Sequence, residues 1–214
     1  MTVHLTNRAL CLLLLVLGSS VALREPEGEE CLKDVVFIVD VSESITVESF
    51  EVQKDFVKNI TSELYMSEFN GSVIATLAFS RNVFGAGLLP FKNITILHEG
   101  IDGLPHEREG THTHLALQRA RDIITEQGRI GVEKLVVIIS DGKSKFPERT
   151  IQEANAAKEE GISIVGVGVE DCPCASNIPE LERITSPGKF YLIRSLQELS
   201  RLVSTIKAEI CDGK

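Results

Sequence analysis

Residues 34–44 read DVVFIVDVSES, an apolar run that ends in one acid and two hydroxyl side chains. Residues 35–39 are β-branched or aromatic and show no polar alternation. This pattern predicts a strand that is buried on both faces, as in a parallel sheet covered by helices. Because an unpaired carboxylate is costly to bury, we expect Asp40 at the carboxyl edge of this strand, where open α/β sheets bind their ligands.

The two hydroxyls that follow Asp40 suggest a metal site. Ser42 and Ser44 continue from Asp40 at a spacing of two, so along an extended turn their oxygens can point the same way. Three converging hard oxygen donors suit Mg²⁺ or Ca²⁺ better than zinc or copper. The same residues are also compatible with a polar strand end and a helix cap, since Ser and Asp are common capping residues.

The rest of the chain alternates apolar runs with segments of helical periodicity. Further strands are expected at 72–79, 134–140, 162–169 and 190–193, and a weaker edge strand in a hairpin at 82–88. Helices are expected at 47–64, 94–101, 113–126, 148–160, 179–184 and 196–210. This alternation predicts an α/β fold with a doubly wound, mostly parallel, Rossmann-like sheet that is flanked by helices and has one short antiparallel edge strand.

A second acid, Asp141, also ends an apolar strand. If its strand lies beside the first at the point where the strand order reverses, Asp40 and Asp141 meet in the crevice at the carboxyl edge. Thr111 lies between them in sequence and precedes the helix at 113–126, so its hydroxyl can reach the same crevice.

The amino terminus has the pattern of a secretory signal peptide. Residues 1–22 contain Arg8, an apolar segment and small residues before the expected cleavage point, and residues 23–33 form a short segment ahead of the main domain. No later stretch approaches the roughly 20 apolar residues that a bilayer span requires. We therefore expect a secreted product without membrane insertion.

The charge of the chain limits its partners. The formal net charge is −9, and it becomes −10 without Arg8 because residues 1–22 hold no Asp or Glu. An acidic domain without a basic run argues against nucleic acid or an anionic membrane as the partner. Cations or basic partners are favoured instead.

Four cysteines remain once Cys11 is removed with the signal, an even number in an oxidising compartment. Cys31 precedes the first strand and Cys211 follows the last helix. Because chain termini often lie close together, we expect these two to form a disulfide. Cys172 and Cys174 could close a strained ring with each other or act as metal-binding thiolates.

Three segments together resemble a known site. Residues 40–44 (DVSES), 110–113 (GTHT) and 140–142 (SDG) are similar to the three parts of the metal-ion-dependent adhesion site (MIDAS) of von Willebrand factor A domains. The resemblance covers residues 34–211, and the bracketing cysteines are more similar to the extracellular matrix group, such as matrilins and collagen A domains, than to integrin subunits. It implies that Mg²⁺, or Mn²⁺ or Ca²⁺, is held by Asp40, Ser42, Ser44, Thr111 and Asp141.

The resemblance implies a secreted, non-enzymatic adhesion or extracellular matrix protein. Its cation would bridge to an acidic residue of a protein partner, such as collagen, another matrix protein or a cell-surface protein. The alternative is a structural matrix module that acts through metal-independent contacts or as a homo-oligomer. Glu109 before Gly110, and His114 after the threonine segment, depart from the usual matrix pattern and bear on the shape of that loop.

Other chemistries receive less support from the sequence. Four histidines cluster in sequence, and His112 and His114 could suggest a zinc site; the others are His98 and His106. We expect side chains two positions apart to point to opposite sides, and no H-E-x-x-H arrangement is present, so zinc binding is not favoured. No G-x-S-x-G elbow surrounds a serine, so nucleophilic catalysis is not expected.

Three N-x-S/T sequons begin at Asn59, Asn70 and Asn93. Asn70, in an expected turn, is the first candidate for N-glycosylation and Asn93 the second. Asn59 depends on whether its face of the helix is exposed.

Overall fold

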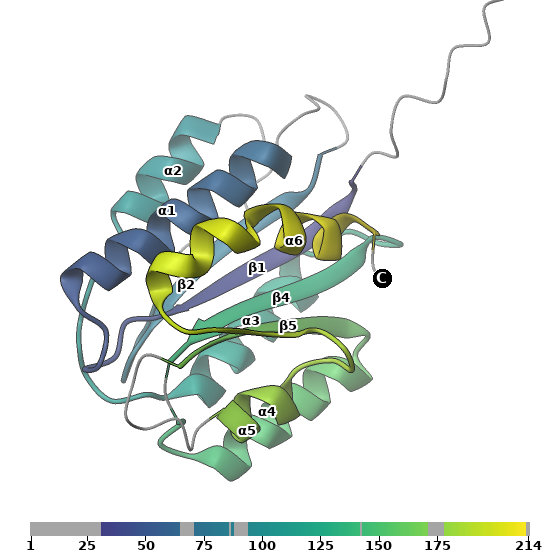
Figure 1. Cartoon of the computed structure of the whole chain (residues 1–214). Coiled ribbons are helices and arrows are strands. Elements are labelled where there is room, and N and C mark those ends of the chain that lie inside the picture. Colours follow the sequence, from purple (N-terminus) through teal and green to yellow (C-terminus); the bar gives the residue numbers. More distant parts are fainter. Residues whose placement is uncertain are drawn as a thin grey trace, which may run out of the picture.

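A computed structural model describes residues 31–64, 71–85, 87, 94–141, 143–170 and 178–212. These residues form a sheet in the order β3-β2-β1-β4-β5-β6, with helices on both faces (Figure 1). The strands are β1 (Lys33–Asp40), β2 (Val73–Phe79), β3 (Val83–Gly85), β4 (Glu133–Ser140), β5 (Ile162–Val169) and β6 (Phe190–Ile193). The helices are α1 (Val47–Leu64), α2 (Ile94–Asp102), α3 (Thr113–Gln127), α4 (Pro147–Glu159), α5 (Ile178–Ile184), the 3₁₀ helix η2 (Leu196–Glu198) and α6 (Leu199–Asp212).

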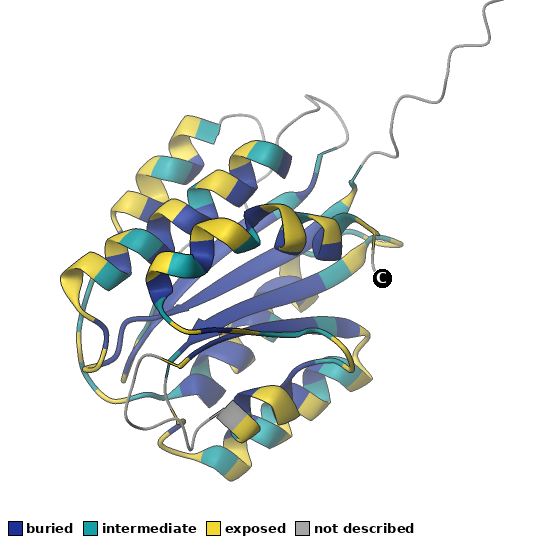
Figure 2. Ribbon diagram, in the orientation of Figure 1, coloured by how far each residue is buried: buried dark blue, intermediate teal, exposed yellow. Residues whose placement is uncertain are grey.

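Strand β1 lies at the centre of the sheet because both of its faces are apolar. Val35, Phe37 and Val39 pack into the core beneath α1 and α6. Val36 and Ile38 pack into a second core beneath α3 and α4. Figure 2 shows the resulting pattern, with the central strands buried along almost their whole length and the outer faces of the helices exposed. The missing polar alternation in β1 therefore reflects two cores that share one strand.

The pairing of the strands places the first acid at the switch point. β1 pairs in parallel with β2 on one side and with β4 on the other, and β3 is the antiparallel strand, paired with β2. The alignment of Val39 with Ile139 brings the carboxyl end of β1 beside that of β4. The predicted doubly wound, mostly parallel sheet with an antiparallel edge strand is confirmed.

The ends of the described domain are joined by a disulfide. Cys31 and Cys211 are bonded, with their Cα atoms 4.9 Å apart. Cys172 and Cys174 lie outside the described residues, as do the expected signal peptide and the candidate glycosylation residues Asn70 and Asn93. Asn59 lies on an exposed position of α1. In the part of the chain that the structure describes, no helix is long and apolar enough to cross a membrane.

Helix α6 is also held by a buried polar contact. Glu209 is only 5% exposed and accepts hydrogen bonds from Lys189 Nζ and from Tyr191 Oη, the latter at 2.6 Å. Burial, together with the neighbouring Glu209, raises the pKa of Tyr191 to about 12. The disulfide and this contact thus fix the last helix to both the first strand and the last one.

Candidate metal centre

Asp40 forms the buried base of the candidate site. Its side chain is 0% exposed, and both carboxylate oxygens accept hydrogen bonds. The amide of Ser42 donates to Oδ1 at 2.9 Å, and the hydroxyl of Ser140 donates to Oδ2 at 2.6 Å. Because Ser140 ends β4, the neighbouring strand itself orients the carboxylate.

Two serine hydroxyls connect this base to the second acid. Ser42 Oγ lies 3.2 Å from Ser44 Oγ, and Ser44 Oγ donates to Asp141 Oδ1 at 3.0 Å. Residues 42–45 form a turn closed by the hydrogen bond from Ile45 N to Ser42 O, rather than a fully extended segment. Ser42 is buried and Ser44 is exposed, so the cluster opens to solvent on the side of Ser44 and Asp141.

Thr111 reaches the same edge through its backbone. Its carbonyl oxygen accepts a hydrogen bond from Lys145 N at 2.7 Å, which ties it to the loop that follows Asp141. His112 N donates to Ser80 O at 2.8 Å, which ties the same segment to the end of β2. The structure therefore links Asp40 to Ser42 through the Ser42 amide, and links Ser42, Ser44 and Asp141 through their side chains. It brings Thr111 to the same loops.

The electrostatics of this cluster favour a cation. Burial, and second the nearby charge of Asp141, raise the pKa of Asp40 to about 6, although the hydrogen bonds from Ser140 and Ser42 act in the opposite direction. A divalent ion would offset the negative charge that burial and Asp141 disfavour. The donors are all oxygens, as Mg²⁺ and Ca²⁺ prefer.

A site of this kind differs from a cluster of acids, thiolates and imidazoles. Among the described residues, no three His, Cys, Asp or Glu side chains are grouped so that they could hold a metal. At this site the carboxylates of Asp40 and Asp141 would bind a metal only together with hydroxyl groups. This is the donor set that the sequence predicts. The donors present therefore fit a hard divalent ion.

The histidines do not form a common site. The expectation that His112 and His114 point to opposite sides is wrong, because their ring centroids lie 5.8 Å apart and both rings contact Phe146. His112 precedes α3 and His114 lies in its first turn. The two residues therefore do not share one helix or one strand, and the rule for side chains two positions apart does not apply to them. His98 contacts Thr61 Oγ1 instead, and burial lowers the pKa of both His98 and His114.

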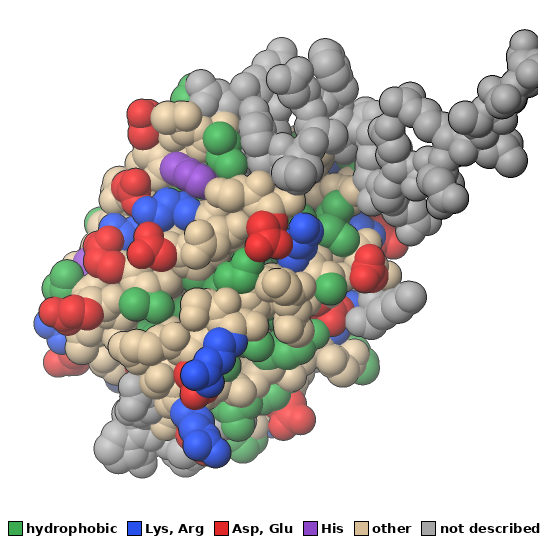
Figure 3. Space-filling model, turned by 45° about the horizontal axis from the view of Figure 1, so that its top comes forward, with side chains coloured by type: hydrophobic (Ala, Val, Ile, Leu, Met, Phe, Trp, Pro, Cys, Tyr) green, Lys and Arg blue, Asp and Glu red, His purple; other side chains and the backbone are tan. Residues whose placement is uncertain are grey.

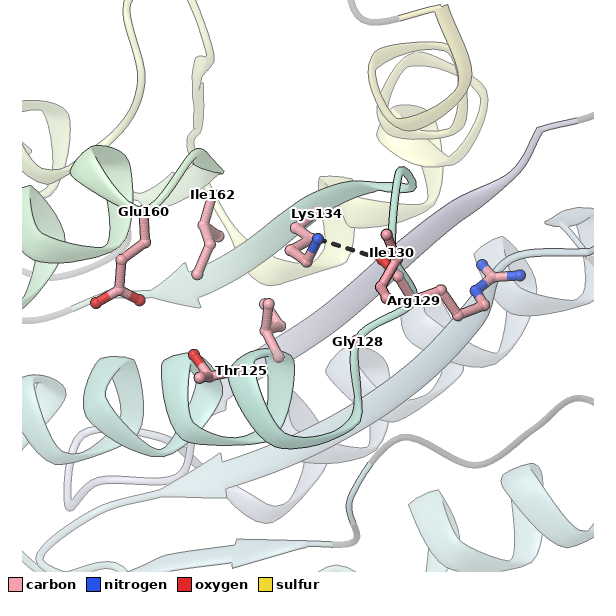
Figure 4. A pocket seen from close by; sticks show the side chains of 8 residues that line it. Thr125, Gly128, Arg129, Ile130, Lys134, Glu160 and Ile162 are labelled. Carbon is pink, nitrogen blue, oxygen red and sulfur yellow. Dashed lines mark hydrogen bonds between the residues drawn. The ribbon is translucent and has the colours of Figure 1, made fainter.

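A separate hollow lies at the opposite, amino edge of the sheet (Figure 4). Its volume is about 430 Å³, and it lies between the carboxyl end of α3 and the beginnings of β4 and β5. Arg129, Ile130 and Lys134 surround it, and the Lys134 ammonium group donates to the carbonyl of Arg129 at 3.4 Å. It contains none of the predicted metal-binding residues.

The chain is thus an α/β domain whose oxygen donors, Asp40, Ser42, Ser44 and Asp141, lie at the carboxyl edge of the sheet, at its topological switch point. The family model of the von Willebrand factor type A domain matches residues 34–205, and the chain therefore belongs to this family.

The chain is similar to collagen and matrilin chains. It is 26% identical over 191 residues to the collagen alpha-4(VI) chain of Mus musculus, covering 88% of this chain and 8% of the relative. It is 26% identical over 189 residues to matrilin-1 of Gallus gallus, covering 86% and 37%. The chain thus spans less than half the length of these relatives.

Solved structures show the same fold. Proximal thread matrix protein 1 from the mussel byssus, in a structure with a zinc-occupied MIDAS motif, superposes with a TM-score of 0.74 at 26% identity, covering 84% of this chain and 48% of that chain. The pilus adhesin SpaC from Lactobacillus rhamnosus GG gives a TM-score of 0.73 at 15% identity, covering 85% and 30%, and shows the fold alone.

Proposed function

We propose that this chain is a secreted adhesion module of the extracellular matrix that binds an acidic residue of a protein partner through a divalent cation. The observation that carries the proposal is the buried Asp40 carboxylate, linked through Ser42 and Ser44 to the half-buried Asp141. A buried acid whose charge is disfavoured, beside a second acid and hydroxyl donors, is a site for a hard cation.

The residues of this site would have different roles in holding the cation. Ser42, Ser44 and Thr111 would supply hydroxyl ligands, and Asp40 and Asp141 would bind directly or through water. When bound, the cation supplies an electrophilic centre for the carboxylate of the partner. Ser140 keeps Asp40 oriented, and exposed Ser44 marks the side from which a partner approaches.

The choice of ion follows from the donors. A site made only of oxygens suits Mg²⁺, with Mn²⁺ and Ca²⁺ as further candidates. The mussel protein shows that a site of this family can hold zinc, so zinc belongs in any comparison of ions.

The proposed role is non-enzymatic. Ser140 donates its hydroxyl to the buried Asp40, and Ser42 lies against Ser44. His112 and His106 are directed to the backbone carbonyls of Arg81 and Ile45. These hydroxyls and imidazoles are engaged in holding loops, so we propose binding and not turnover.

The surface supports a protein partner over a polyanion. On the face shown in Figure 3, which includes α1, α2 and α6, acidic and basic side chains are interspersed. A chain with a net charge of −9 does not attract nucleic acid or anionic lipid. Matrix relatives such as collagen VI chains and matrilin-1 make an extracellular protein partner the proposal that we favour.

Removal of metal is expected to abolish binding. The immobilised domain should capture a purified matrix partner, with collagens tested first, in Mg²⁺, lose it in EDTA and recover it when Mg²⁺ is restored. The Asp141→Ala variant should bind no partner in any of these buffers, because the half-buried acid that faces Ser44 is gone.

The matched control is Asp122→Ala, which removes an exposed acid from α3. It should bind as the unmodified domain does. Partner binding that survives both EDTA and Asp141→Ala would contradict the proposal and favour a structural module with metal-independent contacts.

A further inference from the structure

Residues 106–108 hold residues 41–45, the serine loop, through three backbone carbonyls. The amide of Arg108 donates to Val41 O at 3.0 Å, and its guanidinium Nη2 donates to Glu43 O at 2.9 Å. The imidazole Nε2 of His106 contacts Ile45 O at 3.0 Å. Three carbonyls at alternate positions of the loop are therefore bound by two residues that lie two positions apart.

These carbonyls alternate along the loop with the side chains that form the candidate site. Ser42 lies between the first and second bound carbonyls, and Ser44 between the second and third. The two serine hydroxyls lie 3.2 Å apart, and that of Ser44 donates to Asp141 Oδ1. Holding these carbonyls therefore restrains the backbone from which both serine side chains project.

Arg108 adopts a backbone conformation that L residues avoid. Its φ is 55°, and it is the only non-glycine residue with positive φ in the described ranges. Such a conformation persists only where surrounding contacts impose it, and it occurs often at functional sites. Here it allows one residue to donate both its amide and its guanidinium to the serine loop.

We propose that Arg108, assisted by His106, is a positioning residue that presets Ser42 and Ser44 for cation binding. This inference rests on the proposed function. Residues that orient metal ligands commonly change metal affinity by about 10–100-fold when they are replaced. The same segment continues through Gly110 to Thr111, so its placement sets the position of the third hydroxyl as well.

The direction in which Mg²⁺ affinity changes when Arg108 is replaced distinguishes a positioning role from an effect of charge. Arg108 is cationic, and by charge alone its loss would make the domain bind Mg²⁺ more tightly. Loss of positioning predicts the opposite. In the Arg108→Gly variant, glycine accepts the positive φ and keeps the amide contact to Val41, so only the guanidinium contact is removed.

The first test is Mg²⁺ titration by calorimetry. We expect Arg108→Gly to bind Mg²⁺ about tenfold more weakly than the unmodified domain. Arg108→Lys, whose ammonium can still donate to Glu43 O, should recover most of this loss. Arg149→Ala, which removes an exposed arginine that lies over Phe146, is the charge control and should not weaken binding. Unchanged or tighter binding by Arg108→Gly would overturn the proposal.

The second test needs no metal, so it separates this inference from the proposed function. In EDTA, the amides of residues 42–45 should exchange with deuterium about tenfold faster in Arg108→Gly, as loss of one charge-assisted hydrogen bond predicts. The melting temperature should stay within about 2 °C. Failure of the unmodified domain to bind Mg²⁺ would refute the proposed function alone, whereas unchanged exchange in Arg108→Gly would refute the positioning role of Arg108.

Discussion

Replacement of both Cys31 and Cys211 by serine is expected to lower the free energy of unfolding by about 5 kcal/mol. The bridge joins residues 180 positions apart, so it removes a large loop entropy from the unfolded chain. The size of this effect compares with the whole stability of many domains. Denaturation in urea, in parallel with the unmodified protein, measures it.

Two controls make this measurement specific. The unmodified domain in a reducing agent should show the same loss as the double variant. Cys172→Ser with Cys174→Ser removes the other two cysteines that follow residue 30 and should leave the unfolding free energy nearly unchanged. A loss below about 1 kcal/mol on removal of the bridge would contradict the loop-entropy argument.

The bridge also bears on how the domain works. It fastens the end of α6 to the beginning of β1, while Glu209 holds the same helix to Lys189 and Tyr191. A large displacement of α6 along the sheet would have to break the buried polar contact and is limited by the disulfide. We therefore expect partner binding to proceed without such a displacement.

Replacement of Arg129 by alanine is expected to destabilise the domain by about 3–5 kcal/mol. Asp34 is 0% exposed and accepts hydrogen bonds from Arg129 N at 2.6 Å and Nε at 2.7 Å. The same guanidinium donates to the carbonyls of Gly71 and Lys33. Truncation would leave the buried carboxylate of Asp34 with the amide of residue 129 but without its cationic partner, which costs more than the loss of an exposed ion pair.

A double-mutant cycle tests this explanation. Asp34→Ala combined with Arg129→Ala should be less destabilised than the sum of the two single variants, since the uncompensated charge is then absent. Arg119→Ala, at an exposed position of α3, is the matched control and should change stability by less than about 0.5 kcal/mol. Equal effects of Arg119→Ala and Arg129→Ala would contradict the role of the buried pair.

The fold was predictable because its signals are local. The β-branched run of β1, the two apolar strands that end in acid and the helical segments between them each carry their own pattern. The observed bounds differ from the expected ones by three residues at most, and the largest differences are at β3 and at the start of α6. At α6 the difference arises because residues 196–198 form a separate 3₁₀ turn.

The acids of the candidate site were also visible in the sequence, because parallel strands place their carboxyl ends at one edge. Asp40 and Ser44 follow from β1, and Asp141 from β4. What joins them was not visible. Ser140 is an ordinary strand residue in the sequence, and only the pairing of β1 with β4 turns it into the donor that orients Asp40.

Long-range polar contacts escaped prediction for the same reason. Arg108 lies in a segment without periodicity, and its left-handed backbone becomes evident only when the serine loop lies beside it. The pairing of Asp34 with Arg129 joins residues 95 positions apart. The contact of His112 and His114 with Phe146 depends on a loop that follows another strand. No spacing rule along the chain encodes such contacts.

Calorimetric titration of the purified domain with Mg²⁺, Mn²⁺ and Ca²⁺ tests the central claim most directly, with Asp141→Ala as the comparison. We expect saturable binding of one ion to the unmodified domain and none to the variant, while both retain the same circular dichroism spectrum. Repeating the titration with a short acidic peptide present covers the case in which a carboxylate completes the coordination of the ion. Binding that is equal in the two proteins, or absent from the unmodified domain even with the peptide, would contradict the account.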